Sequence, residues 1–343
     1  MKNRLNNYDL LRIIAAIAVI SIHASARYVN PHDIIVLIYY ILSRFAVPCF
    51  LMLTGALVLS NDKNKEYKYF YTKSFKYIGI PTIIFSIFYF CVSMINRILL
   101  FIQGNTELNN FYIPINNLLT GSPHFHMWYL YMLIGIYIFI PIVIRFKNSI
   151  SEKSFKYISY IFMMLCCVFG LTSNHLLNYD LSLSFIYLSY VMIGYQISKE
   201  NDINNKKAFI FIIFGLAIES LIIVLQYYQI SFLKLDIINN FNPLIALGSI
   251  MIFKGFTHLK VNTDLSKLSK MTFNIYLIHA FVLETLFLIL NKYALIYYNN
   301  STVIIPSLII IVFIISYILS IIYDKFYKKA LIFFQNIYRT KKN

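Results

Sequence analysis

Apolar stretches of about 20 residues recur along the whole 343-residue chain, separated by short polar segments. At a rise of about 1.5 Å per residue, such a stretch crosses the roughly 30 Å hydrocarbon core of a bilayer as one helix. The pattern predicts ten membrane-spanning helices, of which the fifth and sixth are short. The expected spans are 9–28, 34–60, 77–98, a fourth that ends near 144, 157–173, 181–198, 207–228, 237–256, 271–291 and 302–323.

The composition agrees with this pattern. Hydrophobic residues make up 59% of the chain and charged residues only 13%, whereas a soluble domain averages about 25% charged residues. The expected fold class is therefore an all-α membrane protein: a bundle of about ten transmembrane helices, multi-pass in the cell membrane and surrounded by lipid. We expect one transmembrane domain over 1–343, with its core at about 8–323 and a basic cytoplasmic tail at 324–343.

The formal net charge of +16 could indicate a nucleic-acid partner, so the position of the cations matters more than their sum. Successive polar segments alternate between rich and poor in Lys and Arg, and the rich set holds 25 of the 30 cations. This alternation follows the positive-inside rule and predicts an even number of crossings with both termini in the cytoplasm. The basic charge therefore reports orientation, and we expect no nucleic-acid partner.

Two polar connections are longer than the rest. Residues 61–76 form a basic, Tyr-rich segment that we expect to be a cytoplasmic loop, and residues 99–124 form an Asn-rich external connection. Long loops often act as lids or binding elements. Within the second span, Pro48 removes a backbone donor and predicts a kink.

The N-terminus also resembles a cleavable signal peptide. Lys2 and Arg4 precede an apolar run that ends in small residues at 24–26. However, Asp9 and Arg12 interrupt the charge layout of a signal peptide, and the alternation of charge fits only if the first helix stays. We therefore expect the first helix to be retained.

Two ionisable side chains share one face of this first helix. Arg12 and His23 are eleven residues apart, and eleven steps of about 100° come to only about 20° more than three full turns. The cation thus lies at the foot of a stripe and the imidazole about 16 Å farther along it. An ionisable group that faces the interior of a membrane bundle is a candidate functional group.

Further polar groups are expected at similar depth. Counting residues along the helices places Arg44 and His279 near the midplane, and Glu219 and Glu284 at or just outside it. His126 and Trp128 would lie at the outer mouth of the bundle. These groups could converge on one polar cavity that opens outward.

Each of these groups also has a purely structural explanation. Arg12 could be an ordinary basic flank of a span, and His23 could be a neutral ring bonded to a backbone carbonyl. Arg44 is harder to explain in this way, because a guanidinium at mid-depth costs several kcal/mol unless it is paired or solvated. Glu219 and Glu284 could be its partners, or could be protonated.

The same applies to the late span and to the outer mouth. Thr272, Tyr276 and His279 form a polar stripe that could serve helix packing as well as catalysis. His124 and His126 could bind a metal, but the sequence offers no third ligand and interfacial polarity accounts for them. We therefore expect no metal. Trp128 and the abundant tyrosines fit an interfacial aromatic belt.

Four motifs, taken in order along the chain, resemble the integral-membrane acyltransferase family 3, whose members O-acylate surface polysaccharides and related glycans. The resemblance covers essentially the whole chain. The matching residues are Arg12 and His23; Arg44, Pro48 and Phe50 followed by Thr54-Gly55; His126, Trp128, Tyr129 and Leu130; and Ile275 through His279. Thr54 stands where the family has Ser, which keeps the hydroxyl. We expect no appended extracellular esterase-like domain, so members that need one would be poor guides to the acceptor.

The resemblance implies transfer of an acyl group, with acetyl expected, from acyl-CoA to a hydroxyl of a surface polysaccharide or lipid-linked glycan. Acetyl-CoA would be a co-substrate, with no permanently bound cofactor. We assign catalytic roles to His23, Arg12 and Arg44: His23 as general base or as an acyl-imidazole relay, and the arginines on CoA phosphates or the developing oxyanion. The supporting or substrate-binding residues would be His126, Trp128, Tyr276, His279, Glu284 and Glu219.

Two other classes of function compete with the enzyme. A polysaccharide exporter or flippase could use the same polar line as a translocation path, although transporters often show inverted repeats that we do not find here. A membrane module that binds a cell-wall precursor without catalysis is the third possibility.

Overall fold

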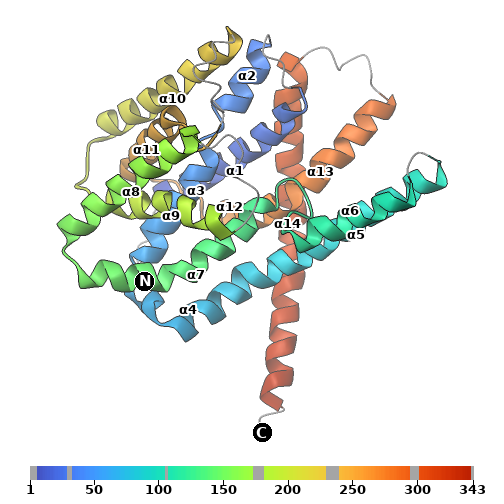
Figure 1. The fold of residues 1–343 in the computed structure, drawn as a ribbon, viewed down its shortest axis with the longest axis horizontal. Helices are drawn as coiled ribbons and strands as arrows, with labels where there is room; N and C mark the ends of the chain where they lie inside the picture. Colours follow the sequence, from blue (N-terminus) through green and yellow to red (C-terminus); the bar gives the residue numbers. More distant parts are fainter. Residues whose placement is uncertain are drawn as a thin grey trace. The chain divides into compact units, whose positions relative to one another are not determined.

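The computed structural model describes residues 6–28, 33–104, 107–172, 181–228, 239–293 and 301–340, and within these ranges every regular element is a helix (Figure 1). The long helices are α1 (Asn6–Ala26), α5 (Ile80–Ile102), α7 (Trp128–Ser149), α8 (Glu152–Thr172), α9 (Leu181–Ile197), α10 (Asn205–Tyr227), α11 (Pro243–His258), α13 (Thr272–Tyr293) and α14 (Ser301–Thr340). The shorter α-helices are α2 (Ile34–Ile41), α3 (Ala46–Thr54), α4 (Tyr67–Ser74), α6 (Tyr112–Leu119) and α12 (Ser266–Ser269).

Eight helical segments are long and apolar enough to cross a membrane, which makes the chain a multi-pass membrane protein. They are Asn6–Ala26, Ile34–Leu59, Tyr67–Ile102, Trp128–Ser149, Glu152–Gly170, Asn205–Tyr227, Thr272–Leu290 and Ser301–Phe333. Two further apolar helices, Ser184–Ile197 and Pro243–His258, are shorter. They occupy the expected sixth and eighth spans, so the count of ten crossings and the cytoplasmic termini stay predictions.

The second span is broken, as Pro48 predicts. Because proline cannot donate to the carbonyl four residues earlier and its ring clashes there, the break is expected around Arg44. The helix indeed stops at Ile41 and restarts at Ala46. Between them the amides of Arg44 and Ala46 bond three residues back, to Ile41 and Ser43. Arg44 therefore lies within the break.

The two long connections are more helical than expected. Within 61–76 the chain forms a 3₁₀ turn (Asp62–Lys65), α4 and a π-helical stretch (Phe75–Gly79) that leads directly into α5. Within 99–124 it forms a 3₁₀ turn (Leu108–Phe111) and α6, which lies along the end of α5 (Figure 1). Lys and Asn interrupt an apolar run without interrupting a helix, so the third span, expected at 77–98, belongs to a longer helical segment, Tyr67–Ile102. The basic tail is likewise helical up to Thr340, as part of α14.

The chain divides into two compact units, which are described separately. The first contains residues 1–50 and 201–343, and the second contains residues 51–200. In the first unit α1 packs against α2, α11, α12, α13 and α14. Leu37 and Ile41 of α2 form a buried cluster with Ile222 and Ile223 of α10 and Ile245 of α11. In the second unit α9 packs against α7, α8 and the π-helical stretch Gly55–Leu59.

Glycines bring helix backbones into contact in both units. In the first unit, a Cβ on Gly215 of α10 would lie 2.6 Å from the carbonyl oxygen of Gly248 on α11 and 2.7 Å from a side-chain carbon of Ile252. In the second unit, a Cβ on Gly194 of α9 would meet the backbone of Met52 in α3. Small residues at helix interfaces allow such approach, which matters in lipid because association there depends on close packing.

We expect Gly215→Ala to lower the stability of the protein. The new methyl group would push the α10 and α11 backbones apart, and overpacking costs about 1–3 kcal/mol, against a gain in helix propensity of about 1 kcal/mol. The apparent melting temperature of the purified protein in detergent measures the effect. Ala217→Val, on the exposed side of the same helix, is the control and should melt with the wild type. Equal melting of Gly215→Ala and wild type would contradict the close contact.

Candidate active site

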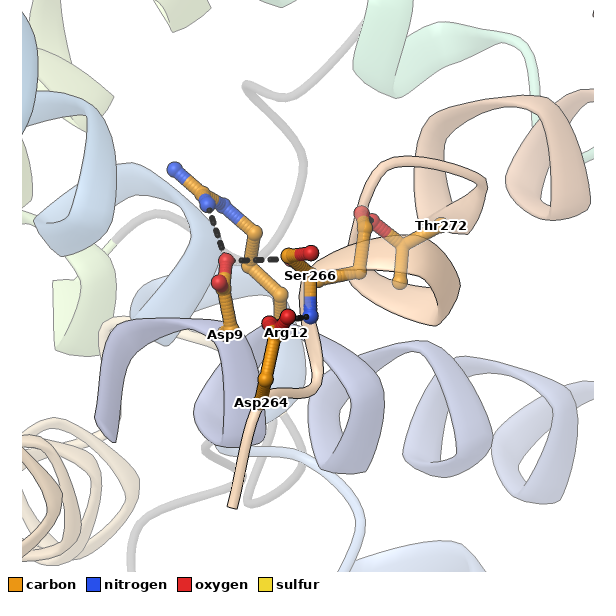
Figure 2. Close-up of polar contacts among 6 residues, drawn as sticks. Asp9, Arg12, Asp264, Ser266 and Thr272 are labelled. Atoms are coloured by element: carbon orange, nitrogen blue, oxygen red, sulfur yellow. Dashed lines mark hydrogen bonds and ion pairs between the residues drawn. The ribbon is translucent and has the colours of Figure 1, made fainter. Parts of the chain in front are cut away.

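The foot of the first helix carries a buried ion pair. Asp9, in the first turn of α1, is 1% exposed, and its Oδ1 accepts a hydrogen bond of 3.0 Å from Nη1 of Arg12. The same oxygen accepts a bond of 2.6 Å from the hydroxyl of Ser269 in α12. Figure 2 shows the carboxylate facing the guanidinium at the base of the helix. The Arg12 side chain keeps 30% of its surface exposed, so a buried carboxylate holds a partly exposed cation.

Farther along α1, two imidazoles stack. The rings of His23 and His279 lie with their centroids 5.4 Å apart and their planes at 29°, so His23 faces α13. His279 is fully buried, and its Nδ1 lies 2.6 Å from the carbonyl oxygen of Tyr276. Because a carbonyl oxygen can only accept, Nδ1 must carry the proton, which leaves the lone pair of a neutral ring on Nε2.

The break in the second span presents Arg44 to an aromatic ring and to a carboxylate. The Arg44 guanidinium carbon lies 4.2 Å from the centre of the Tyr40 ring, a cation–π contact. Arg44 also interacts electrostatically with Glu219 of α10. Glu219 is fully buried, and its Oε1 accepts a hydrogen bond of 3.2 Å from the hydroxyl of Ser249 on α11. That Glu219 is a direct partner of Arg44 stays a prediction.

Glu284 forms an ion pair with Arg27, whereas from the sequence Arg44 could be its partner. Its Oε1 pairs with Nη2 of Arg27 at 3.3 Å, and Arg27 stacks over the ring of Phe287 at 4.6 Å. Both members of the pair are partly exposed, with side-chain exposures of 48% for Arg27 and 33% for Glu284. The pair links the end of α1 to α13, and we assign it a structural role.

His126 and Trp128 belong to the second unit, in an aromatic cluster. His126 is fully buried, its Nδ1 lies 2.9 Å from Nδ1 of His124, and Tyr89 stacks on His124 at 4.4 Å and meets His126 edge-on at 4.9 Å. Trp128 begins α7 and lies 5.9 Å from the ring of Tyr187. Within the described ranges, no three or more His, Cys, Asp or Glu side chains gather as they would around a metal ion.

The first unit therefore brings together Arg12 with Asp9 and His23 with His279, and Arg44 acts electrostatically on Glu219. The expected convergence of His126 and Trp128 with these groups stays a prediction. Sequence reasoning missed Asp9 and Ser269 as members of the site. An acidic residue three positions before a basic one on a helix is a signal for the first, whereas nothing in the sequence connects Ser269 with a residue 260 positions earlier.

Two replacements of Glu219 distinguish the contribution of its hydrogen bond to stability from the contribution of its charge. Glu219→Gln keeps an acceptor for the buried Ser249 hydroxyl, whereas Glu219→Leu removes it and should cost about 1–3 kcal/mol more. We expect the Leu variant to melt well below the Gln variant in detergent. Glu284→Gln, at the exposed pair, is the control and should cost less than about 1 kcal/mol. If the Leu and Gln variants of Glu219 melt together, the hydrogen bond to Ser249 contributes nothing.

The amino-acid sequence of the chain is similar to those of known proteins. The chain is 27% identical, over 320 residues, to probable poly-β-1,6-N-acetyl-D-glucosamine export proteins of Staphylococcus aureus strains MSSA476, MW2 and N315. These alignments cover 84% of this chain and 85% of each relative. No solved structure matches. Residues 5–321 match the family model described as an acyltransferase domain, so the chain belongs to acyltransferase family 3, as its four motifs predict.

Proposed function

We propose that this protein transfers an acyl group from acyl-CoA to a hydroxyl of a surface glycan that contains amino sugars. One observation carries the proposal: a single helix presents a partly exposed cation at its foot and, three turns along the same stripe, an imidazole stacked on a second imidazole. Membership of the acyltransferase family supports the reaction type.

In the reaction, the acceptor oxygen attacks the thioester carbonyl carbon. A new ester C–O bond forms, the C–S bond breaks, and CoA leaves as a thiol. His23 accepts the proton from the acceptor hydroxyl and delivers it to the departing sulfur, so that the ring returns to its starting state. In the relay variant, His23 itself takes the acyl group and passes it to the acceptor.

His279 would support this proton transfer. Its Nδ1–H bond to the Tyr276 carbonyl fixes both the tautomer and the plane of the ring. The stacked His23 ring therefore lies beside an imidazole that is buried and held in one orientation. Such fixed surroundings need no rearrangement when His23 becomes positive, which is the advantage of a preorganised site.

The arginines would handle negative charge. Arg12 lies about 16 Å along the helix axis from His23, and in CoA the pantetheine arm likewise separates the thioester from the phosphates. We therefore assign the phosphates to Arg12, whose planar fork of donors suits phosphate oxygens. Arg44, deeper in the span and close to a buried carboxylate, is assigned to the oxyanion that develops on the thioester carbonyl.

The names of the relatives bear on the acceptor. They are described as probable exporters of poly-β-1,6-N-acetyl-D-glucosamine, a polymer whose sugar rings carry hydroxyl groups. We propose a related amino-sugar polysaccharide, or its lipid-linked precursor, as the acceptor here. The same names favour a second candidate function, namely export of the polymer, in which the polar line of the first unit would form a path for sugar.

We expect His23→Ala to abolish acylation while the protein is still made. Loss of a general base typically costs about 10²–10⁴-fold in rate. The ester-linked acyl content of surface polysaccharide, measured by mass spectrometry in a deletion strain that carries each variant, reports the effect. His258→Gln is the matched control, because this histidine lies near Asp202 and has no role in the mechanism.

The same strains separate transfer from export. If the protein is a transferase, the deletion strain and His23→Ala still place polymer on the surface, without acyl esters. If it is an exporter, the deletion strain keeps polymer inside the cell and the acyl content of any released polymer is unchanged. Normal acylation in His23→Ala would remove this residue from the mechanism.

A further inference from the structure

The end of α11 and the connection that leads from it to α13 are tied to the foot of α1 at three places. The side-chain amide of Asn7 donates to the carbonyl of Thr257, and that of Asn6 donates to the carbonyl of Val261 at 3.2 Å. The third tie is the bond from the Ser269 hydroxyl to Asp9. The first turn of α1 is thereby held against a segment that lies about 250 residues later in the chain.

Of these ties, only the third involves a charge. Asp9 is 1% exposed, and a buried carboxylate is costly unless hydrogen bonds compensate the loss of water. A hydroxyl that donates to a carboxylate at 2.6 Å makes a short, charge-assisted bond. A structural tie needs no charge, as Asn6 and Asn7 demonstrate, so the carboxylate calls for another explanation.

The explanation lies on the other side of the carboxylate. Oδ1 of Asp9 accepts from both Ser269 and Arg12, so one oxygen connects a fixed hydroxyl to a long, flexible cation. Ser269 is itself fixed, because its amide donates to Leu265 and its carbonyl accepts from the hydroxyl of Thr272 at 2.8 Å. Figure 2 shows this chain of contacts from Thr272 towards the guanidinium.

We propose that Asp9 and Ser269 are positioning residues that hold the Arg12 guanidinium in the orientation that receives the phosphates of acyl-CoA. The inference rests on the proposed function. An arginine side chain that is 30% exposed samples many rotamers unless a neighbour restricts it, and preorganisation raises affinity by removing that entropy cost before binding. Neither residue touches the acyl donor in this scheme; both act through Arg12.

The experiment measures the dissociation constant of acetyl-CoA for the purified full-length protein in nanodiscs, by equilibrium binding of radiolabelled acetyl-CoA. We expect Asp9→Asn and Ser269→Ala to weaken binding roughly 5–10-fold each, which is the size of a typical net hydrogen-bond contribution. Asp264→Asn and Ser266→Ala are matched controls in the same segment. Asp264 accepts from the Ser266 amide and contacts solvent, so both controls should bind like wild type.

A double-mutant cycle separates positioning from stability. If Asp9 acts through Arg12, adding Asp9→Asn to Arg12→Gln weakens binding no further than Arg12→Gln alone. A merely structural role would lower the melting temperature and leave the dissociation constant of the folded fraction unchanged. Unchanged affinity in both single variants, or effects that add to that of Arg12→Gln, would overturn the inference.

Two further outcomes are informative. Tighter binding by Asp9→Asn would mean that the carboxylate competes with the phosphates for Arg12, and would also overturn the inference. Wild-type protein that binds neither acetyl-CoA nor a longer acyl-CoA would overturn the proposed function together with it. Failure of the function is therefore visible in the wild type, whereas failure of the inference alone is visible only in the variants.

Discussion

The cost of a charge in apolar surroundings governs the arrangement of the first unit. Asp9 lies between the Arg12 guanidinium and a hydroxyl, and Glu219 accepts from Ser249 and interacts electrostatically with Arg44. The bonds from Ser269 to Asp9 and from Ser249 to Glu219 join different helices, because a partner for a buried charge must come from wherever the packing can supply one. The buried charges thereby help to determine which helices pack together. The cations that act on them include Arg12 and Arg44, residues to which we assign catalytic roles.

The features that depend on local periodicity could be predicted. The stripe on α1 that carries Arg12 and His23 follows from helix geometry alone, and the structure has one continuous helix there. The break near Arg44 follows from Pro48, since its cause lies four residues away. The all-helical, multi-pass fold follows from apolar segment lengths.

Features that depend on tertiary contact could not be predicted. The bond between Asp9 and Ser269 spans 260 residues, and serine on a short polar segment is too common to be a signal. The ion pair between Arg27, which follows the end of α1, and Glu284 of α13 likewise joins residues that nothing in the sequence connects. Hydropathy also predicts that the third span begins after Lys73 and Lys76. In the structure both lysines lie in helical segments that lead directly into α5. Hydropathy measures the preference for lipid and carries little information about where a helix stops.

The length of α14 has a mechanical consequence. Its 40 residues measure about 60 Å end to end. At an ordinary tilt of about 20° it rises about 56 Å, whereas a bilayer with its headgroups is about 40–45 Å thick. One helix is therefore longer than the bilayer is thick, and Figure 1 shows its C-terminal part reaching beyond α13. The basic residues near the end of α14, among them Lys325, Lys328 and Lys329, are therefore carried on the same continuous helix as the apolar span.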